Sequence, residues 1–393
     1  MKKNKKVHVL YILTKLELGG AQKVCLSLME GIKESGNFGA LISGNEGVLI
    51  PQVKKFDSVY LLRNFKREVG IKTVFNEFKT LFQIILYLKK LKKNYPDLIV
   101  HTHSTKAGII GRWAAFFARI KTRVHTVHGF GFHDHQNKIA WMICYLLELF
   151  TSFVTTHYIC VSVYDQNTGK KLLPKFGKKS SIIRAAVEWD KFYIPATRLK
   201  DDFKCKEVFK VPEKKFIIGT VSCLKPQKNI FDLLKAFKQV CDKTKKQNLL
   251  LQVIGDGILR DKIEKWILQN GMKDKIDLLG WQDEVSMWMR NWNVFVMSSL
   301  WEGLPCAVVE ARLSKLPVVS YKIAGIPEVI YDSKNGFLVD AGDWETLAGK
   351  IQKLVLDEVL LKKMKNYSDD LNDFKDRVMV EKHLNLYRQL SSV

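Results

Sequence analysis

The sequence has no Cys-x-x-Cys pair, although it holds seven cysteines in 393 residues. Each cysteine stands alone, which argues against a zinc site and against a disulfide framework. Isolated thiols are typical of a reducing compartment, so we expect a cytoplasmic protein. The sequence also contains no Asp-x-Asp motif and no carboxylate–histidine spacing typical of a metal site. We therefore expect no metal and no cofactor.

No run of about 20 uninterrupted apolar residues is present, and a membrane-spanning helix needs one. The most apolar stretch, Ile139–Val163, is interrupted by Glu148. We expect a buried or interface-lying helix from Lys138 to about Phe153. Shallow contact with a membrane through outward side chains of this helix is an alternative, and the candidates are Trp141, Ile143 and Leu147.

Acidic residues are scarce relative to basic ones, and the formal net charge is +24. The excess is uneven: residues 1–190 hold 30 Lys and Arg against 13 Asp and Glu, a net of +17, and the remainder holds 34 against 27, a net of +7. Such a surface attracts nucleic acid, anionic lipid head groups or phosphorylated substrates. A lysine-rich composition can also be a property of the source genome. We interpret the excess as a property of the first half's surface.

Short β-branched runs alternate with helical patterns along the chain, which predicts α/β architecture with parallel sheets covered by helices on both faces. A hydrophobic fraction of 47% over 393 residues suits two domains with real cores. The expected strands of the first half are Val7–Leu13, Ala40–Ile42, Leu98–His101, Val124–Val127 and Tyr158–Val161. Those of the second half are Phe216–Val221, Leu249–Ile254, Ile276–Leu279, Val294–Met297, Pro317–Ser320 and Gly336–Val339.

The pattern lapses in a charged stretch, Asp190–Pro212, where we place the linker between domains. The predicted domains are residues 1–195 and 196–374. A helix over about residues 375–393 is expected to pack back on the first domain. Ligands of open α/β sheets bind beyond the carboxyl ends of the strands, so the default active site is a cleft between the two halves.

Two glycines, Gly19 and Gly20, follow the first predicted strand and open a predicted helix, Ala21–Glu34. A glycine pair permits positive φ and close approach of a ligand, and a helix N-terminus offers N–H donors to an anion. The full G-x-G-x-x-G fingerprint is absent, so a plain tight turn is the alternative.

Histidines follow two other predicted strands of the first half. His103 and His128 should both project at carboxyl edges, where neutral imidazole can bind sugar hydroxyls or phosphate. Lys106 and Phe130 follow them closely in the sequence and are candidates for the acceptor side, together with His103. A structural role is the alternative for each histidine.

In the second half, Lys225 and Lys228 lie between a predicted strand and a helix, where ammonium groups suit a diphosphate leaving group. The decisive element follows the strand Val294–Met297. It contains Glu302, Gly303 and Leu304, with Glu310 eight residues beyond Glu302 in a helix that Pro305 can begin. Two carboxylates so placed can contact different parts of one ligand lying across the helix N-terminus.

These motifs resemble the retaining family-4 glycosyltransferases of GT-B fold, over essentially the whole chain. The E-x7-E element carries the resemblance most strongly, supported by the Gly-Asp-Gly segment that starts at Gly255. The two histidine segments are similar to the subgroup that builds bacterial capsule and exopolysaccharide. The family's usual arginine at the lysine loop is replaced here by Cys223, and its glycine by Asn229; Lys225 can supply the missing charge.

The resemblance implies two Rossmann-like domains whose parallel sheets face across a cleft. It places Gly19 and Gly20 beside the donor diphosphate, His128 at the donor sugar and Lys228 on the diphosphate. It places Glu302 on the sugar hydroxyls or on the loop that holds the sugar, and Glu310 on the ribose. The expected catalytic residues are His128, Lys228 and Glu302, and the expected donor-binding residues are Gly19, Gly20, Lys225, Gly255, Gly303, Leu304 and Glu310.

The expected reaction is metal-independent transfer of a hexose from a nucleoside-diphosphate sugar, a UDP-sugar by the family's usual choice, with retained configuration. The expected acceptor is a hydroxyl of a glycan linked to polyprenyl diphosphate, at the inner face of the cell membrane. A sugar-nucleotide epimerase of the same architecture is the nearest alternative. A nucleic-acid-binding protein is the more distant one, since only the charge favours it and no nucleic-acid motif occurs.

Overall fold

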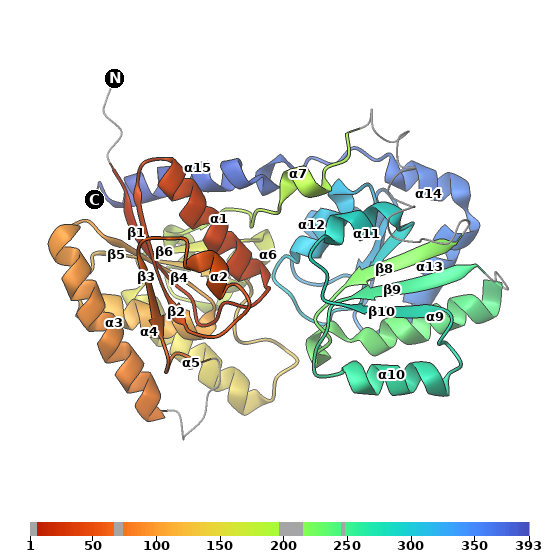
Figure 1. Ribbon diagram of the computed structural model, residues 1–393, viewed down its shortest axis with the longest axis horizontal. Helices are drawn as coiled ribbons and strands as arrows, with labels where there is room; N and C mark the ends of the chain where they lie inside the picture. Colours follow the sequence, from red (N-terminus) through yellow and green to blue (C-terminus); the bar gives the residue numbers. More distant parts are fainter. Residues whose placement is uncertain (1–5, 67–73, 196–214, 245–247, 393) are drawn as a thin grey trace. The chain divides into compact units, whose positions relative to one another are not determined.

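The computed structural model describes residues 6–66, 74–195, 215–244 and 248–392, and these divide into two compact units (Figure 1). The first unit comprises residues 1–186 and 372–393, and the second comprises residues 187–371. Most of the predicted linker, Asp190–Pro212, lies outside the described residues. Each unit is treated by itself below.

The first unit is built on a parallel sheet of seven strands in the order β3-β2-β1-β4-β5-β6-β7. Its strands are β1 (His8–Ile12), β2 (Phe38–Gly44), β3 (Val59–Leu62), β4 (Ile99–His103), β5 (Thr122–Val127), β6 (His157–Cys160) and β7 (Ser180–Ile182). Its helices are α1 (Gly20–Glu34), α2 (Ile50–Val53), α3 (Val74–Asn94), α4 (Thr105–Phe117), α5 (Lys138–Val154), α6 (Val163–Leu172) and α15 (Asp376–Leu390), with short 3-10 turns η2 (Phe176–Lys179) and η6 (Asn372–Phe374).

The second unit is built on a parallel sheet of six strands in the order β10-β9-β8-β11-β12-β13. Its strands are β8 (Phe216–Val221), β9 (Leu249–Ile254), β10 (Ile276–Gly280), β11 (Val294–Met297), β12 (Val318–Tyr321) and β13 (Gly336–Val339). Its helices are α7 (Trp189–Phe192), α9 (Ile230–Thr244), α10 (Arg260–Gln269), α11 (Val285–Asn291), α12 (Cys306–Leu313), α13 (Trp344–Leu356) and α14 (Glu358–Lys365), with 3-10 turns η4 (Pro226–Lys228) and η5 (Ile326–Glu328).

Both parallel sheets have the doubly wound order. Counted in chain order within each unit, the second and third strands lie on one side of the first strand, and the fourth and later strands lie on its other side. The order reverses between β1 and β4 in the first unit and between β8 and β11 in the second. Loops leaving these neighbouring strands diverge, so each sheet has one switch point where ligands of such folds bind. The predicted two Rossmann-like domains are confirmed.

Buried aliphatic side chains on both faces of the sheets form the cores, because parallel strands covered by helices have no face exposed to water. The strands β9 and β11 are buried along their whole length. All five strands expected in the first half and all six in the second half are present. Two edge strands, β3 and β7, were not among the expected ones, because each has only three or four residues and a weak apolar pattern.

Candidate functional site

The loop after β8 and the loop after β11 meet at the switch point of the second sheet. The ammonium of Lys228 donates to Oε1 of Glu302, and the two side chains are only 16% and 11% exposed. Two of the predicted catalytic residues are therefore an ion pair. The pair is held mostly out of water, where a charge interaction is stronger than on an open surface.

Further hydrogen bonds join the same two loops. Nε2 of Gln227 donates to the carbonyl of Trp301 at 2.6 Å, and the backbone N–H of Leu300 donates to the carbonyl of Gln227 at 2.9 Å. Oγ of Ser298 donates to the carbonyls of Lys228 and Asn229 at 3.1 and 3.0 Å. Because both loops are tied through their backbones, the Lys228–Glu302 pair has a fixed position at the end of the strands.

The family's glycine position in this loop is occupied by Asn229, and the structure shows why the exchange is tolerated. Asn229 has φ 44° and ψ 46°, the left-handed conformation that asparagine adopts more readily than most residues. Its side-chain amide donates to Asp232 at 2.5 Å. Asn229 thus keeps the turn after Lys228 that glycine would otherwise supply.

The helix α12 begins at Cys306, directly after Pro305, as the sequence predicts. Gly303 and Leu304 are buried in the preceding loop, where the carbonyl of Gly303 accepts from the N–H of Gly325 at 3.0 Å. Glu310 lies in the second turn and is 9% exposed. Lys225 precedes the η4 turn and is partly exposed.

Gly255, at the end of β9, is a point of close backbone approach. It has φ 121°, and a Cβ there would lie 2.1 Å from the carbonyl oxygen of Ser222 in the loop after β8. Only glycine fits, because the neighbouring backbone occupies the space of a side chain. Gly255 therefore shapes the loop that carries Lys225 and Lys228.

In the first unit the predicted histidines come together at the switch point. Nδ1 of His103, the last residue of β4, lies 3.0 Å from Nε2 of His128, just after β5. His103 is fully buried and His128 is partly exposed. Burial holds the pKa of His103 well below its usual value, and burial followed by the nearby His383 lowers the pKa of His128 to about 4.

Both rings are therefore neutral near pH 7, and in their shared hydrogen bond one nitrogen must donate and the other accept. The tautomers of His103 and His128 are thus coupled, because the ring that donates requires the other to accept. Within the part of the chain that the structure describes, Nδ1 of His128 has no hydrogen-bond partner, so this nitrogen is the one available to a ligand. A neutral imidazole in a fixed orientation suits a hydrogen bond to a sugar hydroxyl better than it suits the binding of an anion.

Backbone strain lies next to this pair. Ser104, the residue after His103, has φ 67° and its hydroxyl lies 2.9 Å from that of Thr14, after β1. A non-glycine residue in this conformation costs free energy and is frequent at functional sites. The strain turns the chain sharply out of β4 at the switch point.

The glycine pair after β1 differs from expectation in one respect. Gly19 caps α1 in an extended conformation with φ −143°, and neither Gly19 nor Gly20 has a positive φ. The prediction that the pair serves positive φ is wrong. The glycines instead leave the start of α1 without a side-chain cap and exposed, which keeps the helix N-terminus accessible to an anion.

The remaining acceptor-side candidates are engaged with their own unit. The ammonium of Lys106 donates to Glu77 at 2.5 Å and to the carbonyl of Lys66 at 2.6 Å. Phe130 stacks on Phe132, with ring centroids 4.8 Å apart. Neither contact brings these side chains to the His103–His128 pair.

Two residues of α15 reach the histidines from the far end of the sequence. The hydroxyl of Tyr387 lies 2.6 Å from Nδ1 of His101, and the ring of His383 lies 5.8 Å from that of His101. Sequence reasoning missed them, because about 280 residues separate α15 from β4 and helical periodicity does not reveal a distant partner. Among the described residues, no three His, Cys, Asp or Glu side chains form a group that could hold a metal ion.

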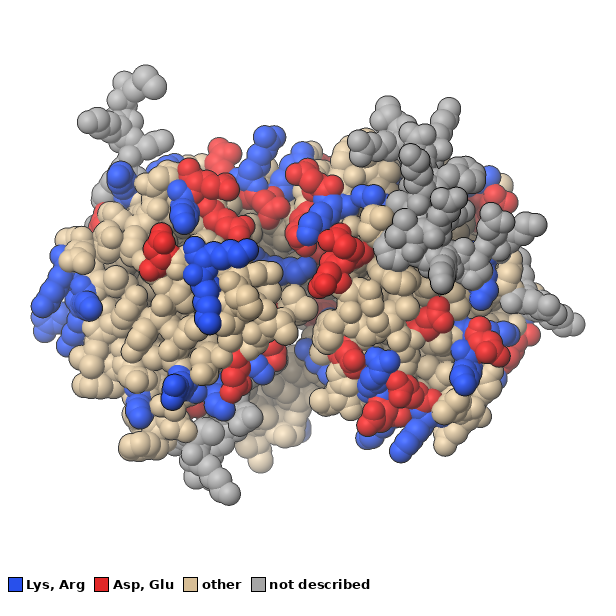
Figure 2. All heavy atoms as spheres, viewed as in Figure 1, with Lys and Arg blue, Asp and Glu red and all other residues tan. Residues whose placement is uncertain are grey.

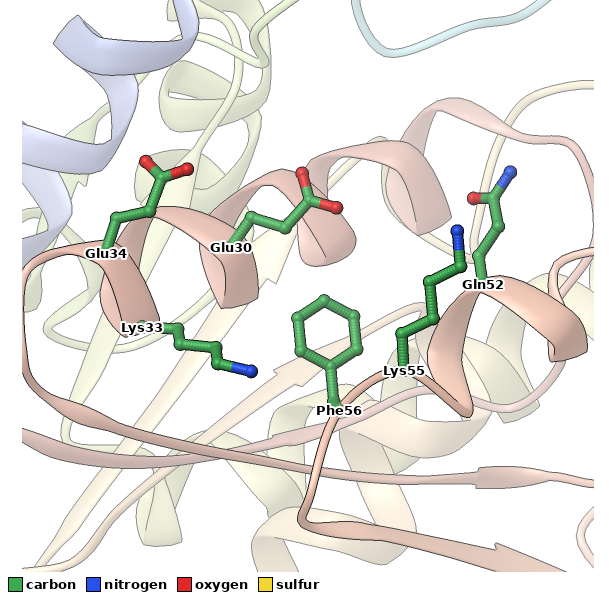
Figure 3. Close-up of a pocket in the computed structure, with 6 residues that line it drawn as sticks. All are labelled: Glu30, Lys33, Glu34, Gln52, Lys55 and Phe56. Atoms are coloured by element: carbon green, nitrogen blue, oxygen red, sulfur yellow. The ribbon is translucent and has the colours of Figure 1, made fainter.

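One surface hollow of the first unit lies away from these residues. Figure 3 shows Glu30, Lys33 and Glu34 of α1 facing Gln52, Lys55 and Phe56. The α1 residues belong to its last turns, so this hollow lies towards the amino ends of the strands, opposite the switch point. It contains none of the predicted site residues.

Comparisons with known proteins match both halves of the chain. A family described as Glycosyltransferase Family 4 matches residues 18–187, and a family described as Glycosyl transferases group 1 matches residues 201–370. The chain is 30% identical to an Escherichia coli UDP-Gal:alpha-D-GlcNAc-diphosphoundecaprenol alpha-1,3-galactosyltransferase, over 97% of each chain. It is 26% identical, over 79% of each, to the Staphylococcus aureus capsular polysaccharide biosynthesis glycosyltransferase CapM.

Solved structures resemble it over almost their entire length. Anabaena HepE in complex with UDP-glucose has a TM-score of 0.78 at 17% identity, covering 98% of this chain and 100% of that one. Sucrose-phosphate synthase from Thermosynechococcus elongatus has a TM-score of 0.81 at 18% identity, with the same coverage. At such identities the likeness shows the fold.

Proposed function

The chain belongs to the glycosyltransferases, with a family 4 first half and a group 1 second half, and on this premise we propose that it transfers a hexose from a UDP-sugar to a lipid-linked glycan with retained configuration. The observation that carries the proposal is the Lys228–Glu302 pair at the switch point of the second sheet, followed by Glu310 in α12. The E. coli relative supports the donor and acceptor classes through its name, which states a UDP-sugar and a diphosphoundecaprenol-linked acceptor.

The reaction breaks the bond between C1 of the sugar and the diphosphate oxygen and forms a bond from C1 to the acceptor oxygen on the same face. The acceptor's proton passes to an oxygen of the departing diphosphate, so no protein nucleophile is needed. Negative charge develops on that diphosphate. Lys228, Lys225 and the N-terminus of α12 are the groups proposed to stabilise it.

Glu302 and Glu310 have separate proposed roles. Glu302 holds Lys228 in place before the donor arrives and contacts the sugar hydroxyls or their loop, and Glu310 binds the ribose hydroxyls. His128 orients the donor sugar as a neutral hydrogen-bonding group, held by its hydrogen bond with His103. No step requires a metal ion, since cationic side chains carry the charge compensation.

We further propose that the enzyme works at the inner face of the cell membrane in the synthesis of a surface polysaccharide. The proposed acceptor is anchored in lipid, and the first half carries the larger positive charge. The structure has no helix, among the described residues, of the length and apolarity that a membrane span needs. Because the proposed acceptor is anchored in lipid, the proposal has the enzyme meet it at the membrane surface.

A donor screen tests the proposal. The purified protein is tested for thermal stabilisation and for hydrolysis across UDP-, GDP- and ADP-sugars, with Glu310→Ala alongside and with EDTA in a parallel series. One UDP-sugar should stabilise the wild type by several degrees and the variant much less, and EDTA should change neither result. NMR of the product formed on a short polyprenyl-diphosphate glycan then reads the anomeric configuration. Absence of any nucleotide-sugar response, or an inverted product, would contradict the proposal.

A further inference from the structure

The helix α5 has its polar side inside and its apolar side outside. Its buried residues include Glu148, Thr151 and Ser152. The large apolar side chains that it exposes recur every three or four residues, are 39 to 76% exposed, and are Ile139, Met142, Ile143, Leu146, Leu147, Phe150 and Phe153. A helix that faces water normally has the reverse arrangement, so the outer side of α5 is built for a different environment.

The inward polar side chains fix the rotation of α5. Glu148 receives two hydrogen bonds of 2.8 Å from the guanidinium of Arg112 in α4, which is fully buried, and one of 2.9 Å from the hydroxyl of Tyr158. Removing this carboxylate from the interior would leave the Arg112 charge buried without its partner. The apolar side of α5 therefore cannot turn inward.

The exposed apolar surface continues over the neighbouring helices. α4 packs against both α3 and α5, and the three helices are the crossovers into β4, β5 and β6, so right-handed connections place them on one side of the sheet (Figure 1). α3 exposes a stripe at Phe75, Phe78, Phe82 and Leu86, and α4 exposes Phe116 and Phe117. We call these residues and the seven of α5 the apolar face. It holds 13 of the 24 exposed large apolar side chains in the described residues.

Positive charge accompanies the apolar face. The helices α3, α4 and α5 together contain eight Lys and Arg against two Asp and Glu. The two acids are paired with Lys106 and Arg112, so the other six cations of these helices, all lysines, set their net charge. Lys89, Lys92 and Lys93 line a hollow with Phe117 and Arg119, and Figure 2 shows the blue side chains gathered over this end of α3.

We propose that the apolar face docks the enzyme on an anionic lipid bilayer, with α5 lying parallel to the surface at the boundary of head groups and acyl chains and the lysines of α3 on lipid phosphates. Apolar side chains on one side of a helix with cations beside them are the features that bind such a surface. A second copy of the chain fits less well, because a symmetric contact would bring the same net positive helices together. The inference rests on the proposed function in one respect: a lipid-linked acceptor gives the enzyme a reason to bind a membrane.

Vesicle sedimentation tests the proposal. Wild type is mixed with vesicles of phosphatidylcholine alone and with 3:1 mixtures of phosphatidylcholine and phosphatidylglycerol. It is compared with the triple variant Ile143→Glu, Leu147→Glu, Phe150→Glu and with Lys89→Ala, Lys92→Ala, Lys93→Ala. Wild type should bind the anionic vesicles, and either variant should bind at least about tenfold more weakly. The lysine variant should also lose much of the salt dependence.

A matched control comes from the second unit. Ile258→Glu, Leu268→Glu, Val359→Glu adds the same charge at three apolar positions that are more exposed, at 62 to 82% against 46 to 58%, and it should bind vesicles within about twofold of wild type. Amide exchange of the wild type should slow in peptides of α3 and α5 when vesicles are added, which tests the face without any variant. Equal binding of the α5 and control variants, or no slowing in these peptides, would overturn the proposal.

Two further readouts keep the outcomes distinct. Wild type that is a dimer, and that becomes a monomer in the α5 variant without binding vesicles, would show that a second copy occupies the face. The response of the α5 variant to UDP-sugars should equal that of wild type. Vesicle binding without any nucleotide-sugar response would contradict the proposed function and leave the docking face standing.

Discussion

The two units share a strand order but differ in the chemistry at their switch points. The second places a charged pair there, Lys228 and Glu302, and the first places a neutral pair, His103 and His128. All nine histidines of the chain belong to the first unit, and the second has none. The topology determines where the loops meet, and the residues in those loops determine whether the site handles charge or hydrogen bonds.

What the two switch points have in common is a backbone constraint. In each unit a glycine stands at the carboxyl end of the second strand in chain order, β2 or β9. It leaves room for the backbone of the loop that follows the first strand, β1 or β8. A Cβ on Gly44 would lie 2.5 Å from the carbonyl oxygen of Thr14, and one on Gly255 would lie 2.1 Å from that of Ser222. Such distances are too short for any side chain, so both loops depend on glycine for their path.

Removing the positive charge of the Lys228–Glu302 pair should have the largest effect on the transfer rate. Lys228→Ala is expected to lower the transfer rate by about 100-fold or more, because it removes a cation proposed to stabilise the leaving diphosphate and leaves the carboxylate of Glu302 without its partner. Steady-state kinetics with saturating donor measure the loss, and calorimetry of UDP binding separates it from weaker donor affinity.

The control is Lys238→Ala, which removes the same charge from an exposed i,i+4 pair on α9. It should leave the rate within about twofold, since exposed pairs contribute little. A drop of less than about tenfold in Lys228→Ala would mean that the pair only braces the loops. In that event Lys228→Met combined with Glu302→Gln should be nearly as active as wild type.

Most of the fold could be predicted, because alternation of buried strands and amphipathic helices is a local signal. β8, β9, β11 and β13 begin and end where the apolar runs do. The short edge strand β7 has two serines among its three residues, and pairing with β6 rather than composition makes it a strand. For α5 the sequence offered outward Ile143 and Leu147 as an alternative, but not the inward polar side, since Glu148 reads as an interruption until Arg112 is seen beside it.

The candidate site could be predicted where one loop holds its own signal. Glu302 and Glu310 are eight residues apart, and Lys228 follows a recognisable strand. What the sequence does not contain is the pairing of Lys228 with Glu302 across 74 residues, or the arrival of His383 beside the histidines of the first unit. Both depend on tertiary packing, and periodicity carries no information about it.

Lowering the pH should destabilise the first unit more than the second. Burial depresses the pKa of His128 from 6.5 to about 4, so the unfolded chain binds a proton that the folded unit resists. Stability is therefore fully present above the unfolded pKa and is lost as pH falls from about 6.5 towards 4, by at most about 3 kcal/mol for this group. Buried His101, His103 and His125, whose pKa values are also depressed, add in the same direction.

Urea unfolding between pH 7.5 and 5, followed by amide exchange of peptides from each unit, measures this difference. The first unit should open at lower urea as pH falls, and the second should change much less. His128→Gln should flatten the pH dependence of the first unit, whereas His135→Gln, at an exposed position, should not. Equal acid sensitivity of both units would show that the depressed pKa values do not govern stability.

The smallest effect is expected at Asn229, and it separates a backbone role from a chemical one. Asn229→Gly should change the free energy of unfolding by less than about 1 kcal/mol and the rate by less than about twofold. Glycine adopts φ 44° without strain, and Asp232 keeps its 2.7 Å hydrogen bond from the hydroxyl of Tyr321. Thermal unfolding and steady-state kinetics are the measurements. A large loss of rate would instead assign the side-chain amide a role in binding.

Asn229→Val tests the backbone role of this position by adding strain where Asn229→Gly adds none. A β-branched residue in the left-handed region costs more than about 1 kcal/mol, and the chain can relieve that strain only by moving the carbonyls of Lys228 and Asn229, to which Ser298 donates. The movement displaces Lys228, so the rate should fall several-fold together with stability. Ser333→Val imposes the same strain, at φ 62° before the amino end of β13, and should lower stability alone. Because both variants strain the backbone and only one adjoins Lys228, a rate loss confined to Asn229→Val would show that the turn serves the charged pair.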